Sequence, residues 1–210
     1  MKSRMGIFLR NTSLKVSSAT VFTVLFLIAG SATAQSDSNS SNKFSGIKIK
    51  NFGQMDERFY RGAQPEAEDY PALAALGIKI IFDLRNDPKD FARQAAEAAG
   101  LRYVNIPMSD KERPEDTQIS DFLRQVNESG DAPFYVHCRG GRHRTGVMGA
   151  VYRIEHYRWN YDRVYSEMKQ YDYYSRWGHG DLKVYVQDYH AREQKETQTA
   201  ITDSAERLQK

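Results

Sequence analysis

The residues best suited to chemistry lie in one ten-residue stretch, 137–146, which reads HCRGGRHRTG. Cys138 is the only cysteine among the 210 residues, so it has no partner for an intramolecular disulfide. The apolar residues before it predict a strand, and a helix is predicted to begin at Thr145. A loop between a strand and a helix start directs backbone N–H groups at one point. Such a point binds a tetrahedral dianion and stabilises a thiolate, so Cys138 is predicted to be a nucleophile with a depressed pKa.

The other residues of the stretch suit the same chemistry. Arg144 is predicted to return over the loop and hold two oxygens of the anion bidentately. Thr145 offers a hydroxyl to the sulfur, which makes the sulfur a better leaving group. The predicted substrate-binding residues are Arg139, Gly140, Gly141, Arg142, His143, Thr145 and Gly146, and His137 is predicted to support them. The competing interpretation, a Cys138 that is only a small buried hydrophobic residue, leaves this pattern unexplained.

The stretch resembles the signature loop of the protein-tyrosine-phosphatase superfamily, His-Cys-x-x-Gly-x-x-Arg-(Ser/Thr)-Gly, at every defined position. The resemblance implies a cysteine-phosphatase fold, a phosphorylated substrate, and no metal or other cofactor. It also implies two displacements. The Cys138 thiolate attacks phosphorus, and water then hydrolyses the cysteinyl-phosphate. Arg144 and the loop amides would stabilise the equatorial oxygens.

The general acid that this chemistry needs should be a carboxyl group on an upstream loop. The segment 107–114 resembles the acid loop of dual-specificity phosphatases, and its Asp110 lies 28 residues before Cys138. Asp116 is the second candidate, although it could instead interact with the dipole of a following helix. Glu112 is the third. No Trp-Pro-Asp loop is present, which argues against the larger tyrosine-specific phosphatases.

Two further segments resemble the dual-specificity group, namely Phe59–Pro65 and Ile81–Arg85. Within them, Arg61, Asp83 and Arg85 are predicted to brace the loop structurally rather than to react.

The ending His143-Arg144-Thr145-Gly146, preceded by Arg142, is similar to that of the plant and fungal atypical dual-specificity phosphatases, some of which act on inositol pyrophosphates. Arg139 and Arg142 add positive charge, which predicts tolerance for polyphosphorylated small molecules beside phosphotyrosine. The alternative is that Arg142 and His143 point away into structural contacts.

Strands alternating with helices must position this loop, which predicts an α/β fold with a mostly parallel central sheet flanked by helices. The strands are expected at 47–52, 78–84, 101–106 and 133–137. The helices are expected after Phe59–Pro65 as far as Leu76, from a cap at Asp87-Pro88 to Gly100, and over 115–128, 145 onward, 161–173 and 179–192. In such sheets ligands bind beyond the carboxyl ends of strands, where Cys138 lies.

The ends of the chain differ from this domain, which is predicted to span 44–194. Residues 1–34 combine a basic start, a short apolar run and Ala32-Thr33-Ala34, the pattern of a secretory signal peptide. Export to the periplasm or medium is therefore expected, with an uncleaved anchor as the alternative; the apolar run is short for a membrane span, so no stable anchor is expected after cleavage. Residues 35–43 are predicted to be a flexible linker, and 195–210 a polar tail that frays.

Charge and histidine spacing exclude other classes of protein. The whole chain has a net charge of +3, but its first 34 residues hold four Lys or Arg and no acidic residue. The rest of the chain therefore has 26 basic and 27 acidic residues, a net charge of −1. No basic run interleaved with aromatics suggests a nucleic-acid partner. His156, His179 and His190 lack metal-ligand spacing and are predicted to be surface or packing residues. The turn Trp177–Gly180 receives no role.

Two other functions stay open for the same residues. One is a non-catalytic phosphate-binding module of the same fold, which retention of Cys138, Arg144 and a candidate acid disfavours. The other is a thiol redox or sulfur-transfer protein, which lacks a second cysteine to resolve an oxidised thiol.

Overall fold

A five-stranded sheet forms the centre of the computed structural model, which describes residues 44 and 46–208. Its strands are β1 (Gly53–Gln54), β2 (Phe59–Ala63), β3 (Ile80–Arg85), β4 (Arg102–Met108) and β5 (Phe134–Cys138), in the spatial order β1-β2-β5-β3-β4. The pairs β2–β5, β5–β3 and β3–β4 are parallel, and only β1 runs antiparallel to its neighbour. The predicted α/β class with a mostly parallel sheet is confirmed.

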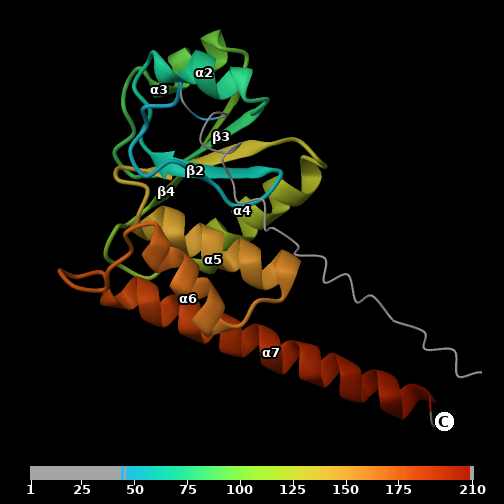
Figure 1. Ribbon diagram of the computed structural model, residues 1–210. Helices are drawn as coiled ribbons and strands as arrows, with labels where there is room; N and C mark the ends of the chain where they lie inside the picture. The colour runs from blue at the N-terminus through green and yellow to red at the C-terminus, as the bar shows by residue number, and fades with distance from the viewer. Residues whose placement is uncertain (1–43, 45, 209–210) are drawn as a thin grey trace, which may run out of the picture. The chain divides into compact units, whose positions relative to one another are not determined.

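Helices cover both faces of the sheet (Figure 1). One face carries α2 (Asp69–Ala75) and α3 (Ala92–Ala98), and the other carries α4 (Asp116–Glu128) and α5 (His143–Tyr157). The last two helices, α6 (Tyr161–Gln170) and α7 (Gly180–Leu208), pack on α5. Because both faces are covered, β2, β3 and β5 are buried along their whole length.

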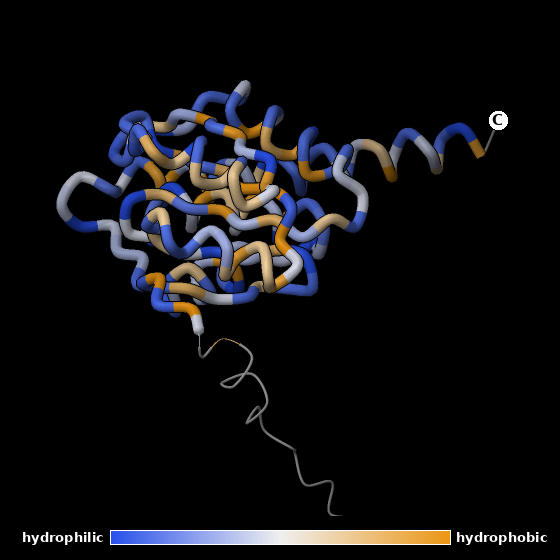
Figure 2. Tube along the Cα trace, turned by 90° about the horizontal axis from the view of Figure 1, so that it is seen from above, coloured by the Kyte–Doolittle hydropathy of each residue, from blue (hydrophilic) through white to orange (hydrophobic). Residues whose placement is uncertain are grey.

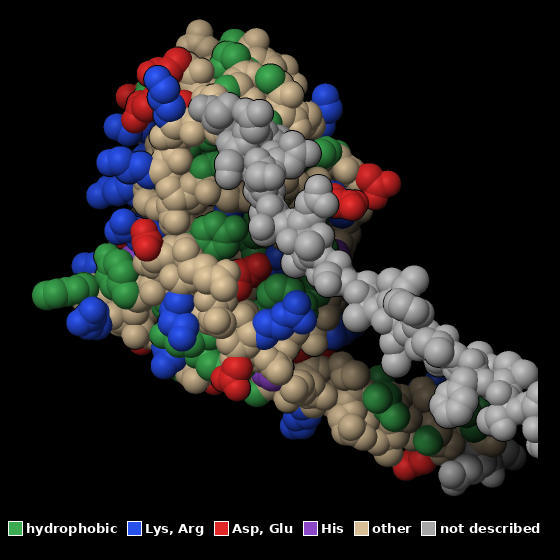
Figure 3. Space-filling view, viewed as in Figure 1, with side chains coloured by type: hydrophobic (Ala, Val, Ile, Leu, Met, Phe, Trp, Pro, Cys, Tyr) green, Lys and Arg blue, Asp and Glu red, His purple; other side chains and the backbone are tan. Residues whose placement is uncertain are grey.

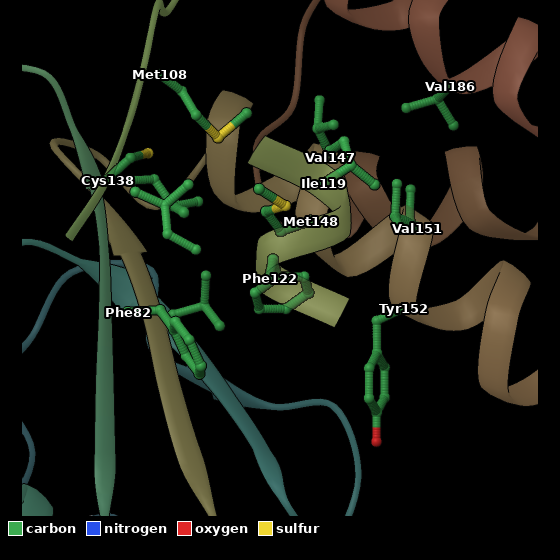
Figure 4. Close-up of a cluster of buried hydrophobic side chains, with 14 of the residues drawn as sticks. Phe82, Met108, Ile119, Phe122, Cys138, Val147, Met148, Val151, Tyr152 and Val186 are labelled. Carbon is green, nitrogen blue, oxygen red and sulfur yellow. The ribbon is translucent and has the colours of Figure 1, made fainter. Parts of the chain in front are cut away.

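The larger of the two cores lies between the sheet and α4, α5, α6 and α7. Aromatic rings fill its centre, where Phe82 of β3 meets Phe122 of α4 edge-on at 5.2 Å between ring centroids. Cys138, at the end of β5, belongs to this core and lies at its edge, on the side of Met108 (Figure 4). The nucleophile candidate is therefore anchored by rigid packing on its inner side.

The structure corrects the predictions for the first elements. Phe59–Ala63, for which no strand was predicted, forms β2, a fully buried strand paired with β5. Long-range pairing overrides the turn-like local composition of this segment. The helix predicted to follow it is present as α2, which begins at Asp69 and has Leu76 as its C-cap. Residues 47–52 form no strand, since Asn51 adopts the left-handed conformation with φ of 56° and breaks the extended backbone.

Two helix predictions also change. α3 begins at Ala92, and Asp87 does not cap it but binds Arg85 and Arg139. The segment 195–208, predicted to be a polar tail, is helical and continues α7, whose last turns leave the body of the fold (Figure 2). Its residues are polar and exposed, as predicted, but the helix after Gly180 contains no glycine or proline and is rich in good helix formers.

The predicted signal segment 1–34 and linker 35–43 lie outside the described residues. Among the helices of residues 44 and 46–208, none has the length and apolar character needed to cross a membrane.

Candidate active site

The loop 139–142 connects the central strand β5 to the first turn of α5. Cys138 ends the strand and is 3% exposed. α5 starts at His143, so the free N–H groups and the positive end of this helix lie beside the sulfur. The predicted strand, loop and helix start are therefore present, with the helix beginning two residues earlier than expected.

Gly141 gives the loop its bend. Its φ is +66°, and a Cβ at this position would overlap the backbone of Gly62 in β2. The Gly141 carbonyl accepts hydrogen bonds from Arg61 Nη2 at 2.7 Å and from Asn51 Nδ2 at 3.0 Å. Arg61 is buried, with its guanidinium 4.0 Å from the ring centroid of Tyr171. The bracing expected of Arg61 is thus visible as a direct contact with the loop.

The thiol of Cys138 lies in surroundings that favour its thiolate. Burial alone would raise its pKa. The hydroxyl of Thr145, the charge of Arg144 and the backbone amides of the loop together lower the pKa by more than burial raises it. The net effect is a pKa below the usual value of a cysteine. A thiolate is the reactive form of cysteine, so the residue is set up as a nucleophile.

Arg144 is 4% exposed and held from one side only. Its Nη1 donates to the carbonyls of Met108 at 3.1 Å and Leu84 at 3.3 Å, and to Oδ1 of Asn86 at 3.2 Å. Its Nε is buried and has no hydrogen-bond partner among the described residues. A buried donor without a partner is unfavourable unless a ligand satisfies it, so this edge of the guanidinium is suited to an anion.

A pocket of about 200 Å³ opens above the sulfur. It is lined by Asp110, Cys138, Arg139, Gly140, Arg142, His143, Arg144, Tyr174 and His179. Six of the predicted site residues are thereby brought together with the predicted acid. Gly141, Thr145, Gly146 and His137 do not line the pocket and lie behind it.

The structure separates the candidates for the general acid. Asp110 lines the pocket with Cys138. Asp116 is the first residue of α4, its side chain is 77% exposed, and it lies 3.5 Å from Arg192. Glu112 is exposed and does not line the pocket. The geometry therefore favours Asp110.

Arg139 and Arg142, the two arginines of the loop 139–142, pair with different acidic residues. The Arg139 side chain is exposed and its Nη2 lies 2.7 Å from Oδ2 of Asp87. Hydrogen bonds from Arg85 and Arg139 keep the pKa of Asp87 well below its usual value. Arg142 lies 3.6 Å from Asp172. Both arginines still line the pocket, so its rim is positive.

Behind the pocket, His137 and Asp83 are completely buried, with His137 Nδ1 3.8 Å from Asp83 Oδ1. Burial lowers the pKa of His137 to about 4, so this imidazole is neutral at neutral pH. Asp83 accepts hydrogen bonds from the Tyr103 hydroxyl at 2.6 Å and the Arg85 amide at 2.8 Å. These contacts fix the strand ends from which the loop departs.

His179 is buried and packs on His143 of α5, as predicted, but its place at the site was not predicted. It lines the pocket and donates from Nδ1 to the Asp110 carbonyl at 2.6 Å. Tyr174, which lines the same wall, was not predicted either. The only local signal was the Gly178-His179-Gly180 turn, in which Gly178 has φ of +86°.

Chemically, one pocket combines the sulfur of Cys138 as a nucleophile, Arg144 as a group that can bind an anion, and Asp110 as a group that can donate a proton. No group of three or more His, Cys, Asp or Glu that could hold a metal ion occurs within residues 44 and 46–208.

Comparison with known proteins agrees with this site. A family described as "DSP-PTPase phosphatase fused to NAD+ Kinase" matches residues 35–198. The chain belongs to this family. The predicted resemblance to the dual-specificity type of cysteine phosphatase is thereby confirmed.

Two relatives place the chain within a wider group. The dual specificity protein phosphatase TpbA of Pseudomonas aeruginosa (strain UCBPP-PA14) is 29% identical over 122 residues, which cover 57% of this chain and 54% of TpbA. The inositol diphosphatase DSP1 of Oryza sativa subsp. japonica is 25% identical over 127 residues, 58% of this chain and 56% of DSP1. The chain therefore spans about half the length of these relatives.

Solved structures share the fold. The crystal structure of P. aeruginosa TpbA aligns with a TM-score of 0.58 and 27% identity over 66% of this chain and 84% of that one. A second TpbA structure, in complex with pTyr, has a TM-score of 0.53 and 26% identity over 65% and 82%. The core catalytic domain of the PP-IP phosphatase SIW14 from S. cerevisiae aligns with a TM-score of 0.59 and 19% identity, over 74% of this chain and 95% of that one. At this low identity the likeness shows the fold alone.

Proposed function

We propose that this protein is a cysteine-dependent phosphatase that hydrolyses phosphomonoesters through a cysteinyl-phosphate. The observation that carries the proposal is that Cys138, whose thiol has a lowered pKa, and Arg144, whose buried Nε has no hydrogen-bond partner among the described residues, line the same small pocket. Membership of the phosphatase family supports it.

In the first step the Cys138 sulfur forms a bond to phosphorus as the bond from phosphorus to the leaving oxygen breaks. Asp110 gives its proton to that oxygen, so the product leaves as a neutral alcohol or phenol. In the second step Asp110 takes a proton from water, whose oxygen bonds to phosphorus while the sulfur departs as thiolate. Arg144 and the loop amides hold the three equatorial oxygens throughout.

Replacing the nucleophile tests this mechanism. Cys138→Ser should lower kcat on an aryl phosphate by about four orders of magnitude or more, because the serine hydroxyl is not ionised at neutral pH. Binding of inorganic phosphate, measured by calorimetry, should persist. Turnover equal to that of the wild type would reject the proposal, and so would thiol oxidase activity without phosphatase activity. Phosphate binding by a wild-type protein without turnover would favour the non-catalytic module.

We further propose that the substrates include polyphosphorylated small molecules as well as phosphotyrosine. Arg139 belongs both to the pocket and to an adjoining groove of about 560 Å³. That groove also carries Lys48, Lys50 and Lys89, which are exposed and form no ion pair with any described residue. In Figure 3, Lys and Arg side chains gather along the left edge of the view. The names of TpbA and of the rice inositol diphosphatase support one substrate class each.

A substrate panel tests this extension. Phosphotyrosine peptide, inositol hexakisphosphate and a phosphoinositide should be compared on the wild type and on Lys50→Gln/Lys89→Gln. We expect KM to rise several-fold for the inositol polyphosphate and least for the phosphotyrosine peptide, since the inositol polyphosphate carries the most phosphate groups beyond the reacting one for these lysines to bind. Lys195→Gln, on the exposed end of α7, is the matched control. Equal rates on all three substrates and no change in the variant would contradict the preference.

We also propose that the protein is exported, on the basis of the signal pattern in residues 1–34. Cell fractionation with antibody to the folded domain should find a shortened chain in the periplasm or medium. A full-length chain in the cytoplasm would reject the proposal, and a full-length chain in the membrane fraction would favour the anchor.

A further inference from the structure

The loop between α6 and α7, residues 171–179, packs against the acid loop 109–113. His179 Nδ1 donates to the Asp110 carbonyl at 2.6 Å. A carbonyl only accepts, so Nδ1 carries the proton. A Cβ at Gly178 would lie in van der Waals contact with the Lys111 side chain, which means that the two loops touch at adjacent residues.

His179 is itself fixed on two other sides. Its ring stacks on that of His143, the first residue of α5, with centroids 3.5 Å apart and planes 14° from parallel. Its own carbonyl accepts a hydrogen bond from the Tyr173 hydroxyl at 3.0 Å. The His179 ring that donates to Asp110 is therefore held in place by α5 and by the loop 171–179.

The acid loop has few other attachments near its acid. Arg144 holds the Met108 carbonyl before it, and an exposed pair between Arg113 and Asp188 at 2.8 Å holds its far end. Between these, the Ser109 hydroxyl accepts only from amides of the same loop. Within the described residues, no hydrogen bond other than that of His179 joins the backbone of Asp110 to another element.

We propose that His179 is a positioning residue of the reaction. By binding the Asp110 carbonyl it fixes the backbone from which the acid projects, and so keeps the carboxyl group at the leaving oxygen. The inference rests on the proposed phosphatase function and on the proposed role of Asp110. It adds a loop from the C-terminal part of the fold to the catalytic arrangement.

Two substitutions separate the hydrogen bond from packing. His179→Asn keeps a donor, because the amide nitrogen is bonded to Cγ as Nδ1 is, but loses the stacked ring. His179→Phe keeps a ring against His143 but loses the donor. If the hydrogen bond positions the acid, Phe should be impaired and Asn should stay close to the wild type. A purely packing role predicts the reverse order.

The readout is the dependence of kcat on the leaving group. Protonation matters most for poor leaving groups, so His179→Phe should lose about ten-fold or more on phenyl phosphate and little on an activated aryl phosphate such as p-nitrophenyl phosphate. The ratio of the two kcat values does not depend on the folded fraction, so partial unfolding of a variant cannot mimic the effect. His190→Phe, on α7 outside the pocket, is the control.

A double mutant completes the test. In an Asp110→Asn background, His179→Phe should add no further loss on phenyl phosphate, because no acid remains to be positioned. An additive loss, or a leaving-group ratio in His179→Phe equal to that of the wild type, would overturn the positioning role while leaving the phosphatase proposal intact. If wild type and Cys138→Ser turned over these esters equally, the phosphatase proposal itself would fail.

Discussion

The guanidinium of Arg144 has two edges with different surroundings. One nitrogen, Nη1, is occupied by carbonyls at the ends of β3 and β4, while Nε is buried without a hydrogen-bond partner among the described residues, and the residue lines the pocket. A lysine at this position would place a point charge where a planar fork is needed. The residue thus both ties the strand ends together and presents an anion site, and sequence spacing predicted only the second task.

The carboxyl groups Asp110 and Asp116 should differ sharply in their effect. Asp110→Asn should lower kcat on phenyl phosphate by about 10²- to 10³-fold and change an activated ester far less, because only the poor leaving group needs the proton. Asp116→Asn should leave both rates unchanged, since its side chain is exposed and pairs with Arg192. Steady-state kinetics on the two esters measures this. The assignment is refuted if Asp116→Asn shows the leaving-group pattern instead.

The hydroxyl of Thr145 should set part of the acidity of Cys138. It lowers the pKa of the thiol, so Thr145→Ala should raise that pKa and move the midpoint of alkylation by iodoacetamide to higher pH. The acidic limb of kcat/KM should move in the same direction, because the thiolate is the reactive form. Thr117→Ala, on the surface of α4, is the control. An unmoved midpoint would remove Thr145 from the list of groups that tune the sulfur.

At the scale of elements, the loop between β5 and α5 depends on one backbone conformation. Gly141→Ala should lower the free energy of unfolding by about 2 kcal/mol or more, since it combines a positive φ with an overlap against the Gly62 backbone. Gly140→Ala should change it by less than about 0.5 kcal/mol, because a Cβ there meets only the Arg142 side chain at 3.8 Å. Urea denaturation of both variants provides the comparison. Equal effects would show that the bend is not what the loop requires.

The elements differ in how far local sequence determines them. β3, β5 and α4 carry strong apolar patterns and were predicted within a few residues. β2 was missed because its five residues, which include a buried arginine and a glycine, become a strand only through pairing with β5. The site shows the same division. Cys138 and Arg144 were readable from one short motif, whereas His179 acts through contacts with segments 36 and 69 residues away, which no local pattern records.

At the scale of the whole molecule, buried histidines should make stability depend on pH. The pKa of His137 is about 4 in the folded protein because of burial, and about 6.5 in an unfolded chain. The unfolded state therefore binds the proton first, and stability is lost as pH falls from about 6.5 to about 4. The loss from this residue should approach about 3 kcal/mol. His143, whose pKa is also about 4 through burial and His179, should act in the same direction.

Chemical denaturation between pH 4 and 7 measures this dependence. In His137→Gln this side chain cannot take up a proton. The slope of the unfolding free energy against pH should therefore fall by the amount that corresponds to about one fewer proton taken up on unfolding. His190→Gln, at a half-buried position of α7, is the control. A slope that is unchanged in His137→Gln would place the pH sensitivity elsewhere.

α7 begins at Gly180, the residue after His179, and runs for 29 residues. At 1.5 Å of rise per residue its axis measures about 43 Å. The helix is therefore a built-in spacer between the pocket and the point where its last turns stand free of the body. A fluorophore or surface linker attached near Leu208 would lie far from the pocket, yet on the helix whose first residue follows His179 of the pocket wall.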